Sequence, residues 1–243
     1  MVEVYGLDMN AQSLDVQAAL FSEQNYAKIF SEYRMEKIKK CRKENTKHQS
    51  IAAGWLLDHV LRQHGMTERT AEFDTGAHGK RLLCAAEGKT ADVNLSHSGQ
   101  YIVCAYNECG TVGIDAECVR EDAEVMRIAK RFFSKVEIDW LEKQKEKAEA
   151  FCILWTRKES FVKRLGAGLS VPLDSFSVLE QETTEKRSGA SEDLKEEQES
   201  VFWKDYKKGN CRITLCAETA DFPEQINWQK ISKKTLAKLE IVW

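Results

Sequence analysis

The sequence lacks the features that mark several large protein classes. No run of its 243 residues approaches the roughly 20 apolar residues that a membrane-spanning helix needs. Its beginning, MVEVYGLDMN, has no basic segment followed by an apolar stretch, as a secretion signal would. The 36 basic and 39 acidic residues give a net charge of −3, which is not the basic excess of a general polyanion binder. We therefore expect a cytoplasmic protein that binds neither membranes nor nucleic acid.

The eight cysteines lack the CxxC spacing of zinc sites and redox-active dithiols. Several of them lie inside apolar runs such as YIVCAY and FCILW. Structural disulfides are rare in cytosolic proteins, and a buried free thiol packs as a small apolar group. We expect free thiols here, and neither a zinc site nor a disulfide framework.

Helical and strand-like segments alternate without a strict βαβ pattern. IAAGWLLDHVLRQHG predicts a buried helix face that ends at Gly65, and AFCILWTRKESFVKRLG predicts a second helix. VNLSHSGQYIVCAYN and TVGIDAECV predict two strands joined near residues 108–110, VPLDSFSVLE predicts a strand, and VFWKDYKKGNCRITLCAE predicts a hairpin. We predict an α+β fold with an amino-terminal half (1–108), a carboxy-terminal half (109–243) and a mobile polar loop at 181–200. A site between the halves is expected, because pockets commonly form at domain interfaces.

Two carboxylates lie two residues apart in the strand-like TVGIDAECV. On an extended strand Asp115 and Glu117 point to one face, while Val112, Ile114 and Ala116 point to the other. Neighbouring carboxylates repel each other unless a cation lies between them, and oxygen-only ligands suit Mg²⁺ or Mn²⁺. On this spacing alone, an exposed edge with two acidic residues is the more common explanation.

A second pattern lies on the predicted helix WTRKESFVK. Trp155, Glu159 and Lys163 recur at every fourth residue and share one helical face. A surface Glu–Lys ion pair beside a core tryptophan also explains this pattern, and a short motif alone is a weak indicator of function.

Ser96 and His97 begin a strand-like segment in NLSHSG, where short polar side chains and backbone amides can meet a phosphate. Hydrolase chemistry is the competing interpretation. The sequence has no GxSxG nucleophile elbow, however, and adjacent side chains on a strand diverge.

Lys37 and Lys40 share a helical face in a basic run. Most such runs are solvated, but a small polyphosphate needs only a few lysines.

Taken together, the motifs resemble those of the Sfp-type 4′-phosphopantetheinyl transferases, whose signatures are a G-x-D-x-E strand and a W-x-x-K-E-x-x-x-K helix. Here they read GIDAE at 113–117 and WTRKESFVK at 155–163. The spacing between them and the segments NLSHSG, AKRFFSK, GLSVPLDSFSV and DFPEQI are also similar to the family. The resemblance covers nearly the whole chain, is weakest at 181–200, and is more specific than any single motif.

The resemblance implies two similar α+β halves related by a pseudo-twofold, in a monomer that binds coenzyme A in the cleft between them. It implies Mg²⁺-dependent transfer of 4′-phosphopantetheine to a serine of an apo acyl or peptidyl carrier protein, with release of 3′,5′-ADP, in fatty acid, polyketide or nonribosomal peptide synthesis. The implied metal ligands are Asp115, Glu117 and Glu159, and the implied catalytic residues are Glu159 and Lys163. The implied coenzyme A contacts are Lys37, Lys40, Gly79, Lys80, Ser96, His97 and Lys163.

Two positions depart from the family. Gln49 lies where an arginine is common, which removes one phosphate donor unless Lys47 or His48 replaces it. Arg81 lies where a proline is common, and adds a donor.

Carrier proteins are generally acidic helical bundles, so we expect docking on the basic, apolar-centred segment Cys118 to Lys135.

Two alternatives stay open: a metal-dependent hydrolase of coenzyme A or a related nucleotide, and a coenzyme A binding module. The presence of all three carboxylates favours an enzyme.

Overall fold

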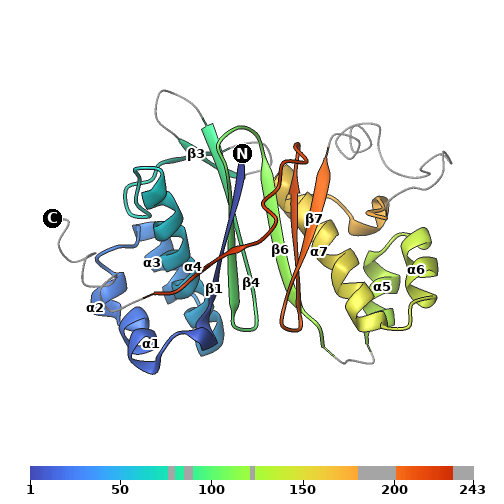
Figure 1. Ribbon diagram of the computed structural model, residues 1–243, viewed down its shortest axis with the longest axis horizontal. Helices are drawn as coiled ribbons and strands as arrows, with labels where there is room; N and C mark the ends of the chain where they lie inside the picture. The colour runs from blue at the N-terminus through green and yellow to red at the C-terminus, as the bar shows by residue number, and fades with distance from the viewer. Residues whose placement is uncertain (76–79, 85–89, 121–123, 180–200, 232–243) are drawn as a thin grey trace.

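The computed structural model describes residues 1–75, 80–84, 90–120, 124–179 and 201–231. It has the predicted mixed α+β fold, built on a six-stranded sheet of order β2-β3-β4-β5-β1-β9 and a three-stranded sheet of order β6-β8-β7. Helices α1 to α4 lie outside the first sheet and α5 to α7 outside the second, so the two sheets occupy the centre of the molecule (Figure 1).

The strands are β1 (Val2–Asp8), β2 (Phe73–Thr75), β3 (Arg81–Cys84), β4 (Thr90–Ser98), β5 (Tyr101–Asn107), β6 (Val112–Cys118), β7 (Phe202–Lys208), β8 (Cys211–Ala217) and β9 (Asn227–Gln229). The helices are α1 (Leu14–Phe21), α2 (Glu23–Tyr26), α3 (Glu32–Lys39), α4 (Glu44–Gln63), α5 (Val125–Phe132), α6 (Lys135–Glu142) and α7 (Lys147–Leu165). Short 3-10 turns cover Met9–Ala11, Gly168–Ser170 and Leu173–Ser175.

Most of the predicted elements are present, with two corrections. The run VNLSHSGQYIVCAYN forms a β4–β5 hairpin rather than one strand, because Gly99 adopts a positive φ of 56° and reverses the chain. VPLDSFSVLE contains a 3-10 turn and no strand over its described residues. The predicted loop at 181–200 lies outside the described residues.

The helices bury their apolar faces on the sheets. Helix α4 packs on the six-stranded sheet around Leu56 and Leu61, and α7 packs on β6 and β8. The glycine of GIDAE permits this second contact, since a Cβ at Gly113 would lie 1.9 Å from the Ser160 carbonyl oxygen. Between the sheets, Val112, Ile114 and Ala116 of β6 are buried with apolar residues of β1, β5 and β8, as the strand pattern predicted.

The two sheets meet along β4 and β6, which share no main-chain ladder in the described residues. Alternate β4 side chains instead accept the amide hydrogens of alternate β6 residues. The pairs are Val112 N to Asp92 Oδ2 (2.7 Å), Ile114 N to Asn94 Oδ1 (3.0 Å), Ala116 N to Ser96 Oγ (3.2 Å) and Cys118 N to Ser98 Oγ (3.0 Å). Because side chains alternate along a strand, every second residue of β4 takes part.

The carboxy-terminal strand β9 pairs in parallel with β1, so residues after the second sheet return to the first sheet. The segment between β5 and β6 spans residues 108–111, where the chain passes from one sheet to the other. The division into halves at residues 108 and 109 stays a prediction. In the described part of the chain, no helix has the length and apolar character needed to span a bilayer.

The expectation that every cysteine is a free thiol is wrong for one pair. Cys118 at the end of β6 lies directly opposite Cys211 at the start of β8, and a disulfide joins them. The two positions are 93 residues apart in sequence, so their pairing depends on the register of the β6–β8 ladder. The other six cysteines are free, and three of them, Cys104, Cys152 and Cys216, are buried.

Alkylation tests this pairing. Iodoacetamide treatment in denaturant without a reductant is expected to label six of the eight cysteines, and prior reduction is expected to expose all eight. Peptide mapping of the unreduced protein should link Cys118 to Cys211. Labelling of all eight without reduction would contradict the assignment.

Candidate active site

Asp115 lies at the centre of the candidate site. It is 6% exposed, at the middle of β6. Its Oδ1 accepts hydrogen bonds from Ser96 Oγ (2.9 Å) and Lys163 Nζ (2.7 Å). Its Oδ2 is buried and has no hydrogen-bond partner. A buried carboxylate oxygen without a partner is costly, so this atom is one that a cation would stabilise.

Lys163 extends from α7 to meet β4 and β6 together. Its Nζ donates to Asp115 Oδ1, to Ser96 Oγ (3.0 Å) and to the Ile114 carbonyl (3.2 Å). The simple surface pair between Glu159 and Lys163 is therefore not what the structure contains. These three acceptors use all three N–H donors of the ammonium, and 28% of the Lys163 side chain is accessible, so a bound phosphate oxygen would replace one of them.

The two glutamates of the motifs lie on either side of this centre. Burial raises the pKa of Glu159, and the charge of Asp115 raises it further, while Lys163 opposes the shift. Burial also raises the pKa of Glu117, Arg120 lowers it, and Asp115 raises it. Ser98 Oγ donates to Glu117 Oε2 over 3.5 Å, and Arg120 lies 3.7 Å from Oε1. The charge of Asp115 thus disfavours the charged forms of both glutamates.

These residues fit a divalent cation, although they do not converge on one point as they stand. No group of three His, Cys, Asp or Glu side chains among the described residues is arranged to hold a metal ion. The Lys163 ammonium meets the Asp115 carboxylate instead. The unpartnered Asp115 Oδ2, the raised pKa values and an oxygen-only donor set are what a hard cation such as Mg²⁺ would relieve.

Two of the predicted phosphate-binding residues, Ser96 and His97, flank this centre on β4. Ser96 is buried and bridges Asp115, Lys163 and the Ala116 amide. Desolvation lowers the pKa of His97, and the charges of Lys163 and Lys37 lower it further. Lys37 is therefore close enough to act on this site, and a bound phosphate would offset the repulsion between these cations.

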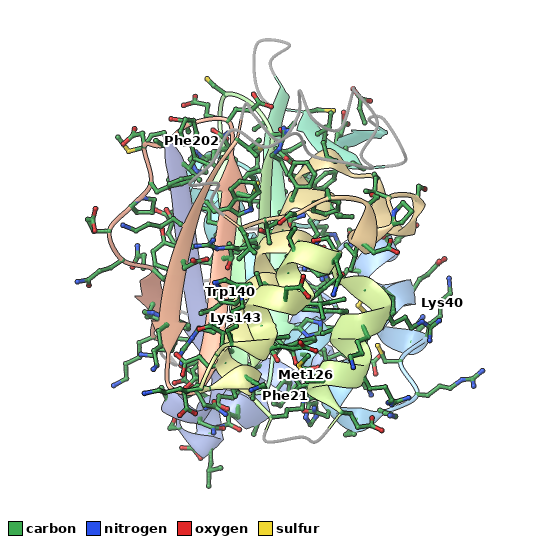
Figure 2. The ribbon with its side chains drawn as sticks, turned by 90° about the vertical axis from the view of Figure 1, so that its right-hand side faces the viewer. Phe21, Lys40, Met126, Trp140, Lys143 and Phe202 are labelled. Carbon is green, nitrogen blue, oxygen red and sulfur yellow. A yellow bond between two sulfur atoms is a disulfide. The ribbon has the colours of Figure 1, made fainter. Side chains whose placement is uncertain are left out.

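Lys40 is less closely associated with the site. It follows the last residue of α3, and its side chain is 79% exposed and 3.6 Å from Glu36. Figure 2 shows it at the edge of the molecule. Such a lysine contributes a screened, mobile charge.

Lys80 makes buried contacts within the protein that the sequence did not predict. Its Nζ hydrogen bonds with Asp92 Oδ2, the Val112 carbonyl (3.0 Å) and the Arg164 carbonyl (2.8 Å). These three acceptors use all three N–H donors of the ammonium, and its side chain is 8% exposed. The ammonium of Lys80 thus holds the junction of β4, β6 and α7, and its contact with coenzyme A stays a prediction. Gly79 lies outside the described residues.

Gln49, one of the two departures from the family, lies near the β4–β5 turn. Its side-chain amide donates to the Gly99 carbonyl over 3.0 Å. The amide is therefore used to tie α4 to the turn that follows His97. The sequence did not predict that Ser98 and Arg120 contact Glu117, although Arg120 lies in the predicted docking segment Cys118 to Lys135. Ser98 had one signal, since it is two residues after Ser96 and shares its face of β4.

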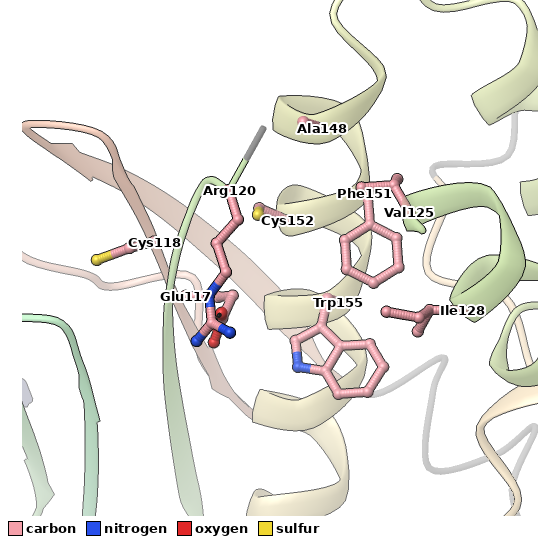
Figure 3. A pocket seen from close by; sticks show the side chains of 9 residues that line it. All are labelled: Glu117, Cys118, Arg120, Val125, Ile128, Ala148, Phe151, Cys152 and Trp155. Atoms are coloured by element: carbon pink, nitrogen blue, oxygen red, sulfur yellow. Dashed lines mark ion pairs between the residues drawn. The ribbon is translucent and has the colours of Figure 1, made fainter. Parts of the chain in front are cut away.

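Two hollows flank the carboxylates. One, of about 180 Å³, lies between the end of β6, α5 and α7, with Glu117 and Arg120 at one side and the rings of Phe151 and Trp155 at the other (Figure 3). Its lining is mainly apolar. We call it the α5 hollow.

The second hollow, of about 360 Å³, lies on the other side of the site. It is lined by Glu159 and Lys163, by the apolar side chains Val162, Val171 and Leu173, and by Asn94, Gly166 and Gly168. We call it the α7 hollow.

Comparison with known proteins places the chain in a family. Residues 111–216 match the model of the 4′-phosphopantetheinyl transferase superfamily. The chain is 34% identical to 4′-phosphopantetheinyl transferase Sfp of Bacillus subtilis (strain 168), over 93% of this chain and 96% of that protein. It is 32% identical to 4′-phosphopantetheinyl transferase ffp of Bacillus subtilis, again over 93% and 96%.

The matched segment contains both motifs and all three carboxylates, and the full-length similarity extends this to nearly the whole chain. The chain belongs to the Sfp-type 4′-phosphopantetheinyl transferases, and it transfers 4′-phosphopantetheine to carrier proteins.

Proposed function

We propose that Asp115, Glu117 and Glu159 hold the Mg²⁺ that this family uses, beside the pyrophosphate of coenzyme A. The observation that carries this proposal is that Asp115 Oδ2 is buried without a hydrogen-bond partner, while the charge of Asp115 raises the pKa of both Glu117 and Glu159. When bound, a divalent cation neutralises the charge that builds on the phosphate oxygens during transfer. Mn²⁺ satisfies the same donor set.

The remaining groups act on the pyrophosphate and on the carrier serine. Lys163 binds a non-bridging phosphate oxygen, with Ser96 and His97 on the adjacent strand and Lys37 nearby. Glu159, whose raised pKa makes it a better base, accepts the serine hydroxyl proton on a carboxylate oxygen. The serine oxygen bonds to the β-phosphorus as the bridging P–O bond breaks, and 3′,5′-ADP leaves.

The pantetheine arm of coenzyme A is assigned to the α7 hollow. The α7 hollow opens beside Lys163 and Glu159 and has apolar walls, which suit the branched, largely apolar start of the pantetheine arm. Coenzyme A would then lie between the halves, which we take to be related by a pseudo-twofold. In support of that relation, a long helix packs on each sheet, α4 on β5 and α7 on β6.

Carrier docking is assigned to Cys118 to Lys135, of which 121–123 lie outside the described residues. Helix α5 exposes Arg127, Lys130 and Arg131, while Val125 and Ile128 line the α5 hollow next to Glu117. Met126 lies on the face seen in Figure 2. A basic rim around an apolar centre complements an acidic helical partner.

Intact mass spectrometry tests the reaction and separates it from the alternatives. An apo carrier protein incubated with this protein, coenzyme A and Mg²⁺ is expected to gain about 340 Da, and chelation or Glu117→Ala is expected to slow the gain at least about 10²-fold. Release of 3′,5′-ADP without a carrier would indicate a hydrolase instead. Binding of coenzyme A with neither product would indicate a binding module.

Glu159→Gln is expected to abolish transfer while raising the melting temperature of the metal-free protein. Folding raises the pKa of the Glu159 carboxyl group. Its contribution to the free energy of unfolding is therefore fully present below the unfolded pKa and is lost as pH rises through the folded pKa. At pH 7 to 8 in EDTA the variant should therefore melt higher than the parent. Its melting temperature should also depend less on pH between about 4 and 8, and rise less on adding Mg²⁺. A lower melting temperature in EDTA would contradict the repulsion argument.

Charge reversal on α5 tests the docking surface. Arg127→Glu and Lys130→Glu are each expected to raise the KM for the carrier by several-fold to about tenfold and to leave the KM for coenzyme A unchanged. Lys230→Glu makes the same charge change on the segment after β9 and is the matched control. An unchanged carrier KM in both α5 variants would rule out this surface.

A further inference from the structure

Lys158 belongs to the WTRKE motif, yet the reaction described above gives it no part. It lies on α7 next to Glu159 and is completely buried. Its Nζ is 2.8 Å from Glu137 Oε2 on α6, donates to the Leu173 carbonyl over 2.6 Å and also donates to the Phe176 carbonyl. The ammonium lies 4.2 Å from the centre of the Phe176 ring. These three acceptors satisfy all three of its donors.

Glu137 is equally buried and equally satisfied. Its Oε2 accepts from the amide and the hydroxyl of Ser134, each over 2.9 Å, in the capping box of α6. Its Oε1 accepts from the Val178 amide over 2.8 Å. The buried pair therefore holds both ends of the segment from Leu173 to Val178, which has no strand partner among the described residues.

That segment leads from one wall of the α7 hollow. Val171 and Leu173 line this hollow together with Val162, Glu159 and Lys163 of α7. The distance between this wall and the reacting groups is thus set by the Lys158 ammonium, which attaches the Leu173 carbonyl directly to α7.

Stability alone does not explain such a pair. Removing two charges from water costs as much as their attraction returns, so an apolar pair of similar volume is often as stable. Burial lowers the pKa of Lys158 because removal from water disfavours the charged ammonium. Glu137 opposes this shift. What the pair supplies that an apolar pair cannot is three directional hydrogen bonds, two from Lys158 and one to Glu137, to a segment that pairs with no strand among the described residues.

We propose that Lys158 is a positioning residue for coenzyme A, holding the wall at Val171 and Leu173 at the width that the pantetheine arm requires. The inference rests on the proposed assignment of the arm to the α7 hollow. Lys158 does not touch the substrate. It acts through the Leu173 and Phe176 carbonyl groups, and its loss affects the arm rather than the nucleotide.

The test compares coenzyme A with 3′,5′-ADP, which lacks the whole 4′-phosphopantetheine group (the arm and its β-phosphate), by calorimetry in the presence of Mg²⁺. Lys158→Met alone would leave Glu137 charged and unpaired, so it is combined with Glu137→Gln, which removes both charges. The double variant is expected to bind coenzyme A about tenfold more weakly and 3′,5′-ADP as the parent does. Its KM for coenzyme A should rise with kcat and the carrier KM within about twofold of the parent.

Two single variants complete the experiment. Glu137→Gln keeps the two carbonyl bonds of Lys158 and is expected to bind both ligands nearly as the parent does. Lys147→Met removes an exposed lysine at the start of α7, whose Nζ donates to the Gln144 carbonyl, and is the matched control.

Leu173→Ala tests the same wall without touching the buried pair, and answers the question if the double variant does not fold. It too is expected to weaken coenzyme A and spare 3′,5′-ADP. Equal loss for both ligands, or no loss for either, overturns the inference. Failure of the parent to transfer phosphopantetheine to a carrier would instead reject the proposed function, and that outcome is measured separately.

Discussion

The site depends on the hydrogen bonds that join β4 to β6. One edge of β6 pairs with β8, which leaves the amides on its other edge without a main-chain partner. A buried amide that lacks an acceptor costs about 1–3 kcal/mol, so the polar side chains of β4 are required. Each pair joins residues 20 positions apart, and this constant register brings Ser96 to Asp115 and Ser98 to Glu117. A shift of one residue would turn the carboxylates into the apolar layer between the sheets.

Around this junction the protein keeps charges that burial disfavours. The charge of Asp115 disfavours the charged forms of Glu117 and Glu159. Lys163 opposes this effect at Glu159, and Arg120 and the Ser98 hydroxyl oppose it at Glu117. Such an arrangement reduces the stability of the metal-free protein and increases its affinity for a cation and a polyphosphate. The repulsion lowers the free energy of unfolding of the metal-free protein, and it is relieved when substrate and metal bind.

Helix α7 connects these charges to the rest of the carboxy-terminal half. One face carries Glu159 and Lys163 to the site, and the adjacent Lys158 points into the buried contact with Glu137. Gly113 lets the helix approach β6 closely enough for Lys163 to reach the Ile114 carbonyl. The same helix therefore sets both the charge at the reaction centre and the wall of the hollow beside it.

Local patterns in the sequence were sufficient for the α+β class, for most elements and for the alternation that turns Asp115 and Glu117 away from the apolar layer, because period 2 and period 3.6 are properties of neighbouring residues. They were also sufficient for the family, through two motifs whose spacing is specific.

The register between distant strands decided three features that no local pattern encodes. These are the use of Lys80 at the junction, the role of Ser98 and the Cys118–Cys211 disulfide. The segment VPLDSFSVLE at 171–180 was predicted as a strand, and its described residues form none. The carbonyls of Leu173 and Phe176 and the amide of Val178 bond instead to the buried side chains of Lys158 and Glu137. Only tertiary packing brings those charges to it.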